Sequence, residues 1–147
     1  MPSKHNKLEV AIAEDFGPRF APGAKLIYID DTAKKTLVLE EAAFAKLGIP
    51  VSEHGKFPDV ILYDSKQKWL FLIEAVTAHG PISPKRHIEL EKLFGKCKAG
   101  KIYVTAFLDF ATYKKYASDI AWEAEVWITE MPSHMIHFNG DKFLRPR

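Results

Sequence analysis

The sequence predicts an α/β fold in which helices flank a mixed central sheet, and three observations support this prediction. Apolar runs at 60–63 and 69–73 surround five polar residues, a pattern typical of a β-hairpin. The second run does not alternate apolar with polar residues, so both faces of that strand are expected to be covered. Helical segments alternate with strand-like runs along the chain, as in α/β sandwiches.

A first helix is predicted over about 7–16, where apolar residues recur at helical spacing. Asn6 is its expected N-cap, Glu9 is expected to complete a capping box, and Gly17-Pro18 is expected to end the helix. The remaining elements are expected as a strand at 25–30, a short helix at 40–47 closed by Gly48, a helix from Ser83-Pro84 to Phe94, a strand at 101–107, a helix capped by Asp109 and reaching about Ile120, and a strand at 125–128.

Length and composition indicate one globular domain. The chain has 147 residues, and its apolar, charged and aromatic contents of 47%, 27% and 12% exclude disorder, collagen-like repeats and a disulfide scaffold. The single cysteine, Cys97, lies on an apolar helical stripe and is expected to be a small core residue. We expect a reducing, cytoplasmic setting and no membrane association, because there is neither a signal peptide nor a long apolar segment.

The charge is unevenly distributed although the net charge is only +2. Residues 85–101 contain six basic side chains against two acidic ones. The basic residues are Lys85, Arg86, Lys92, Lys96, Lys98 and Lys101. Such a segment is either a solvated helix and loop or, beside a reactive site, part of a surface that binds nucleic acid.

Two carboxylates occupy unusual positions in the predicted hairpin. Asp59 precedes its first strand, and Glu74 follows the apolar run of its second. Depending on the turn, Asp59 lies opposite either Ile73 or Glu74. In the second register the two carboxylates face each other, with Cβ atoms about 4.5–5.5 Å apart. Their repulsion favours a neutralising cation such as Mg²⁺, whereas the alternative is a turn cap beside a surface ion pair.

The spacing of these carboxylates resembles the PD-(D/E)XK nuclease motif, since Phe57-Pro58-Asp59 is followed after fourteen residues by Glu74-Ala75-Val76. Longer segments make the resemblance more specific. They are the segments at 73–77, 79–86, 101–107, 120–123 and 136–141. Together they resemble the BsuBI/PstI family of type II restriction endonucleases.

This resemblance implies a PD-(D/E)XK restriction-endonuclease-like fold and Mg²⁺-dependent cleavage of double-stranded DNA at a palindromic, CTGCAG-like site. It also implies a homodimer, Mg²⁺ held by Asp59 and Glu74, and a methyltransferase that acts on the same DNA site without binding the nuclease. Residues 1–147 would form a single nuclease-like catalytic domain, without the further N-terminal region that enzymes of this family carry.

One motif position departs from the pattern, because Val76 stands where the motif has a lysine. Lys85, at the start of the following helix, is the candidate catalytic replacement; the alternative is a solvated first-turn lysine. His79, Ser83, Lys85 and Arg86 are candidate DNA contacts, although His79 could instead be a structural donor.

Two functions therefore remain open on the sequence. The first is a metal-dependent endonuclease. The second is a catalytically inactive DNA-binding module that has kept the nuclease fold. The sequence favours the endonuclease, because an uncompensated glutamate in an apolar strand would only cost stability.

Overall fold

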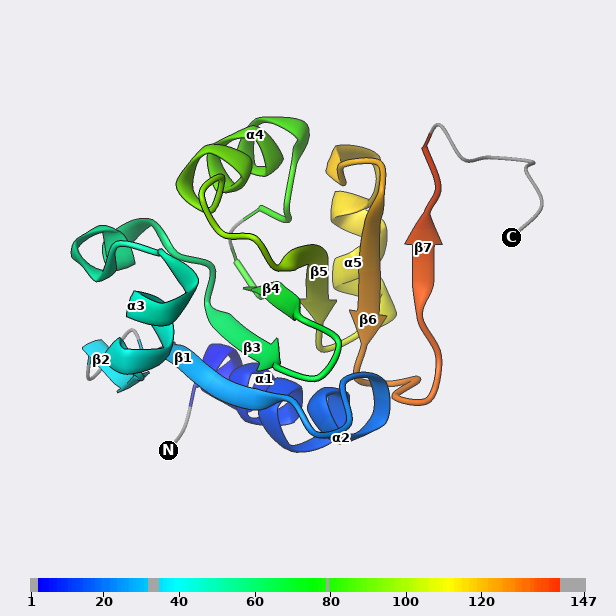
Figure 1. Cartoon of the computed structure of the whole chain (residues 1–147). Helices are drawn as coiled ribbons and strands as arrows, with labels where there is room; N and C mark the ends of the chain where they lie inside the picture. Colours follow the sequence, from blue (N-terminus) through cyan, green and yellow to red (C-terminus); the bar gives the residue numbers. More distant parts are fainter. Residues whose placement is uncertain (1–2, 32–34, 79, 141–147) are drawn as a thin grey trace.

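The structure describes residues 3–31, 35–78 and 80–140. Within these ranges the strands form one seven-stranded sheet in the order β2-β1-β3-β4-β5-β6-β7 (Figure 1). The structure is a computed structural model. Its strands are β1 (Lys25–Asp31), β2 (Lys35–Leu39), β3 (Val60–Asp64), β4 (Trp69–Val76), β5 (Gly100–Phe107), β6 (Ala124–Ile128) and β7 (Ile136–Phe138). β4, β5 and β6 are parallel and the other neighbours antiparallel, which confirms the expected mixed sheet.

Helices cover both faces of this sheet (Figure 1). They are α1 (Lys4–Ala11), the π-helical η1 (Ile12–Phe16), α2 (Gly17–Phe20), α3 (Glu41–Leu47), the 3₁₀ helix η2 (Val51–Lys56), α4 (Pro84–Leu93), α5 (Phe110–Tyr116) and the 3₁₀ helix η3 (Ala117–Asp119). None of the helices in the described ranges is long and apolar enough to cross a lipid bilayer.

The first face is covered by the continuous helical run α1-η1-α2. Leu8, Ile12 and Phe16 are almost fully buried in one cluster with alternate residues of β4, and the Phe16 and Trp127 rings meet edge to face with centroids 5.6 Å apart. Burying large side chains at helical spacing stabilises this docking, since each contributes about 1.5–3 kcal/mol. The apolar residues whose spacing predicts the helix are therefore the ones that pack against the sheet.

The second face is covered by α3 and α4, whose Phe44, Leu90 and Phe94 are fully buried. α5 packs further along the same face, over Val76 and Phe107. Because both faces of β4 are occupied, its sequence is apolar without alternation, and the expected covering of this strand is confirmed.

The start and end of the first helix differ from the prediction. Ser3, not Asn6, is the N-cap, and its Oγ accepts from the Asn6 N–H. The helical run also does not stop at Gly17-Pro18 but continues to Phe20. The π-helical turn widens the backbone there, so Pro18 sits in the first turn of α2, where a missing N–H costs little.

Other predicted caps are confirmed. The Ser83 hydroxyl accepts from the Arg86 N–H at the start of α4, and Asp109 accepts from the Thr112 N–H at the start of α5. Gly48 ends α3 with a φ of 74°, a conformation that favours glycine. Cys97 is 3% exposed, as expected for a core residue.

Strand β2 and helix η2 are not predicted by the sequence patterns, and α5 ends at Tyr116, before the predicted Ile120.

A buried hydrogen bond fastens the loop that leads into α4. The Oγ1 atom of fully buried Thr105 accepts from the Ile82 N–H at 3.1 Å. We predict that Thr105→Val, which keeps the shape, lowers the free energy of unfolding by about 1–3 kcal/mol, because the Ile82 N–H loses its acceptor. Urea unfolding measures this change. Thr105→Ser keeps the acceptor and is expected to lose only about 0.8 kcal/mol for one methyl group. A valine variant at least as stable as the serine variant would contradict the assignment.

Candidate active site

The register of the β3-β4 hairpin brings Asp59 and Glu74 together. Asp64 pairs with Trp69 and Val60 with Ile73, so the same register continues to Asp59 opposite Glu74. This is the second of the two registers considered from the sequence. The two side chains are close enough for the charge of Asp59 to raise the pKa of Glu74.

Asp59 is oriented by the backbone of the neighbouring strand. Its Oδ2 accepts from the Ala75 N–H at 2.8 Å, and its Oδ1 lies 3.5 Å from the Nε2 atom of His5. Since one oxygen is occupied by the backbone, the other is held toward helix α1. About a fifth of the side chain is exposed, at 21%, so the carboxylate is accessible to a ligand.

Glu74 carries a partly compensated charge inside the fold. Its side chain is 16% exposed, and its Oε1 accepts from both Nε and Nη2 of Arg86, at 3.1 and 2.8 Å. Burial, and then the charge of Asp59, raise the pKa of Glu74 to about 7, although Arg86 opposes the rise. Arg86 thus offsets part of the negative charge of the two carboxylates.

Arg86 reaches this position from the first turn of α4. The Ser83 cap fixes the start of that helix, and a second ion pair joins Arg86 Nη1 to Glu89 at 3.4 Å. Val76, at the motif-lysine position, is 1% exposed in the cluster under α5. The neighbouring Lys85 is exposed. Geometry therefore places a guanidinium from α4 beside Glu74, while the catalytic role of Lys85 stays a prediction.

Helix α1 adds two residues that the sequence analysis did not assign to the site. Glu9 is 2% exposed and does not complete a capping box; its Oε2 instead lies 3.6 Å from the Nε2 atom of His5. Burial raises the pKa of Glu9. Interactions with Asp59, and then with Glu9, raise the pKa of His5 to about 10. The spacing of Glu9 from Ile12 and Phe16 could have indicated this, because it places Glu9 on the buried face of the helix.

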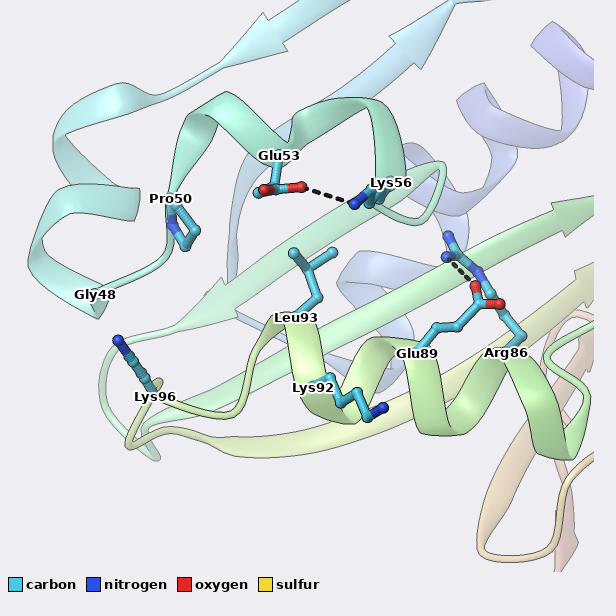
Figure 2. A pocket seen from close by; sticks show the side chains of 9 residues that line it. All are labelled: Gly48, Pro50, Glu53, Lys56, Arg86, Glu89, Lys92, Leu93 and Lys96. Atoms are coloured by element: carbon cyan, nitrogen blue, oxygen red, sulfur yellow. Dashed lines mark hydrogen bonds and ion pairs between the residues drawn. The ribbon is translucent and has the colours of Figure 1, made fainter.

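A groove of about 670 Å³ adjoins Arg86 between η2 and α4 (Figure 2). Its lining consists of Gly48, Pro50, Glu53, Lys56, Arg86, Glu89, Lys92, Leu93 and Lys96. Four of these side chains are basic and two are acidic, so the groove carries a net positive charge. Three members of the basic segment 85–101 thus line a concave surface, and one of them, Arg86, is also the hydrogen-bond partner of Glu74.

The donor set suits a hard divalent cation. Asp59 and Glu74 supply carboxylate oxygens at the ends of adjacent strands, and Mg²⁺ prefers oxygen ligands with the rest of its shell left to water or phosphate. Two predicted DNA contacts remain, Ser83 and His79. Ser83 is half-buried and caps α4. His79 lies outside the described residues.

Comparison with known proteins gives consistent results. The type II restriction enzyme BsuBI of Bacillus subtilis is 49% identical over 145 residues, which cover 99% of this chain and 46% of that enzyme. The type II restriction enzyme AplI of Arthrospira platensis is 33% identical over 164 residues, covering 94% and 51%. The structure of the SdaI restriction endonuclease superposes with a TM-score of 0.90 at 42% identity, over 99% of this chain and 46% of that one.

These matches confirm the restriction-endonuclease-like fold that the sequence predicts. The chain spans about half the length of the relatives it matches. Its sequence fits the family described as the BsuBI/PstI restriction endonuclease domain over residues 1–141. Because that match takes in nearly all of the 147 residues, the chain belongs to the BsuBI/PstI restriction endonuclease domain family.

Proposed function

We propose that this chain is the catalytic domain of a type II restriction endonuclease that hydrolyses phosphodiester bonds in double-stranded DNA. The observation that carries the proposal is the placement of Asp59 opposite Glu74 with the Arg86 guanidinium beside them. Paired carboxylates next to a fixed cation suit an anionic substrate whose charge increases in the transition state. The names of the relatives support the same reaction.

Asp59 and Glu74 would hold Mg²⁺. When bound, the ion polarises the scissile phosphate and lowers the pKa of bound water. Asp59 is preorganised for this role because the Ala75 N–H fixes its carboxylate. Glu74 is held in the same way by two hydrogen bonds from Arg86. Side chains that are fixed before the substrate arrives need no reorganisation during the reaction.

Arg86 is the positioned cation of the proposed site. A guanidinium stays protonated at every pH at which proteins fold, and its fixed donors suit phosphate oxygens. The basic groove next to it offers Lys92 and Lys96 along a path for the DNA backbone (Figure 2). Contacts of this kind position the duplex without reading its sequence.

The target is proposed to be a palindromic, CTGCAG-like site in cytoplasmic DNA, which a methyltransferase modifies without binding the nuclease. Cutting both strands of a palindrome requires two active sites related by a twofold axis, so we propose a homodimer.

The alternative is an inactive DNA-binding module, and Val76 at the motif-lysine position is the observation that favours it. The environment of Glu74 favours the enzyme. A module without catalysis gains nothing from a largely buried carboxylate whose pKa is raised by burial and by a second carboxylate.

Cleavage in the presence of Mg²⁺ tests the proposal directly. The purified chain and duplex DNA containing CTGCAG are expected to give discrete fragments, whose ends can be mapped. We predict that Glu74→Gln abolishes cleavage and leaves DNA binding equal or tighter, because repulsion of the phosphates falls. Activity within tenfold of the parent would contradict the metal-ligand role. Binding without cleavage by the parent chain, at every Mg²⁺ concentration, would favour the inactive module.

Thermal unfolding without DNA tests the Mg²⁺ site separately. We predict that saturating Mg²⁺ raises the Tm of the parent chain by several degrees, since a ligand at 100 times its Kd contributes about 2.7 kcal/mol. Asp59→Asn is expected to remove this rise. Glu14→Gln is a matched control, because Glu14 is an exposed carboxylate in the same helical run as Glu9. An equal rise in the Asp59→Asn variant would place the ion elsewhere.

Two neighbouring cations can be compared to locate the catalytic charge. We predict that Arg86→Ala lowers kcat by roughly 10²–10³, the effect of one preorganised electrostatic group. Lys85→Ala is expected to weaken binding to all DNA sequences and to leave the turnover of bound DNA unchanged. The slope of log binding constant against log salt concentration is expected to fall in magnitude by about one. Arg86→Lys, which keeps the charge, and circular dichroism distinguish a lost charge from a lost fold. The reverse assignment of the two effects would restore Lys85 as the catalytic cation.

A further inference from the structure

We propose that a second basic groove, at the end of β4 away from the carboxylate pair, binds the phosphate backbone of the DNA duplex outside the target sequence. Its four lysines come from three separate segments of the chain and are Lys46, Lys68, Lys96 and Lys98. We call it the hairpin-end groove, because Lys68 lies in the turn between β3 and β4. The proposal rests on the proposed function, since the occupant is the DNA substrate of the same domain.

The hairpin-end groove is strongly positive. It has a volume of about 420 Å³, and apart from the four lysines its described lining is uncharged. All four lysines are exposed, and no ion pair among the described residues includes any of them. Four like charges around one concave surface repel one another, so the groove favours an anionic ligand with several charges.

The backbone that carries these lysines is fixed by the core. The Gly100 N–H donates to the Lys68 carbonyl at 2.8 Å, which ties the hairpin turn to the loop before β5. In that loop Cys97 and Ala99 are buried, whereas Lys98 between them is exposed. The buried residues anchor the loop, so the lysines are presented from a fixed backbone rather than from a free one.

The carboxylate of the hairpin turn, Asp64, is occupied within the turn itself. Its Oδ1 accepts from the Lys66 and Gln67 N–H groups at 3.0 and 3.1 Å, and its Oδ2 accepts from the Gln67 side-chain amide at 2.9 Å. These bonds stabilise the turn that holds Lys68 at a φ of 58°. The ammonium group of Lys68 is therefore left for a ligand.

The hairpin-end groove continues the groove beside Arg86. The two grooves share Gly48 and Lys96 in their linings. Figure 2 shows these two residues at the end of the first groove that is farther from Arg86. The positive surface thus extends from the guanidinium next to Glu74 toward the hairpin turn. A duplex with regularly spaced phosphates suits such a track better than a small anion does, and lysines bind phosphates as point charges.

The length of this track places the hairpin-end groove at or beyond the end of the target. Lys68 immediately precedes the first residue of β4, and Glu74 lies near the other end of that strand. A strand advances about 3.3 Å per residue, so the two residues are roughly 20 Å apart along β4. Phosphates of one DNA strand follow at about 3.4 Å along the helix axis, so the groove meets the backbone roughly six base pairs from the carboxylate pair. Contacts there position the duplex without reading its sequence.

A binding cycle with neutral DNA flanks tests the proposal without measuring activity. Glu74→Gln serves as the parent, so that the DNA stays intact, and fluorescence anisotropy gives the Kd of two duplexes of equal length that contain CTGCAG. One has native phosphates throughout, and the other has uncharged methylphosphonates outside CTGCAG. Neutral flanks are expected to weaken binding by the parent. Adding Lys68→Gln and Lys98→Gln is expected to reduce this penalty at least about fivefold and to lower the salt slope for the native duplex by about two.

Lys114→Gln with Lys115→Gln is the matched control. It removes the same charge from two exposed lysines of α5 that line neither groove. This control is expected to keep the full penalty for neutral flanks, which separates a local contact from a change in net charge.

The outcomes distinguish this proposal from the proposed function. Equal binding of the two duplexes by the parent, a full penalty in the Lys68 and Lys98 variant, or no DNA binding at all would overturn the groove. Tighter binding of polyglutamate than of native DNA, lost in that variant, would also overturn it and assign the groove to an acidic protein. Cleavage by the chain with Glu74 intact is measured separately. Cleavage without the expected change in penalty overturns the groove alone, and the expected change without cleavage supports the groove and overturns the proposed catalysis.

Discussion

The register of one antiparallel strand pair determines the geometry of the site. Pairing of Asp64 with Trp69 carries Asp59 to the position opposite Glu74. A shift of one residue would turn the side chains of β3 to the other face of the sheet, and both apolar clusters would lose their partners. The register that builds the hydrophobic core therefore also builds the carboxylate pair. Packing and function cannot be changed independently here.

The charge in this region is balanced from two opposite sides. Arg86 comes from α4 on one face, and His5 comes from α1 on the other. Asp59 lies between these contributions because it sits at the end of a strand, where both faces of the sheet can be reached. Two helices that bury separate apolar clusters thus meet at one group of ionisable side chains. Each helix supplies both packing and charge.

The sequence predicts the part of this arrangement that follows local rules. The hairpin, the Ser83 cap and the pairing of carboxylates all follow from short-range patterns. It predicts less well the contacts that depend on where α1 docks. Glu9 satisfies the spacing rule for a capping box, yet the helix begins at Lys4 and turns Glu9 inward. Edge strand β2 pairs on one side only, so its sequence carries a weak signal.

A similar limit applies to the cation beside Glu74. Val76 shows that β4 supplies no cation at the motif-lysine position. The choice between Lys85 and Arg86 depends on the rotation of α4 about its axis. A difference of one residue rotates a side chain by about 100° on a helix. The helix rotation is set by the burial of Leu90 and Phe94, which lie further along the chain.

Because the cation comes from α4, the charged group depends on a helix as well as on the sheet. A lysine on β4 would accompany Glu74 as soon as the strand formed. Arg86 can contact Glu74 only where α4 is docked through Leu90 and Phe94, and the Thr105 hydroxyl fastens the loop that precedes this helix. A partly folded chain with a complete sheet would therefore hold both carboxylates without their guanidinium. The complete group of charged side chains therefore requires the helical layer as well as the sheet.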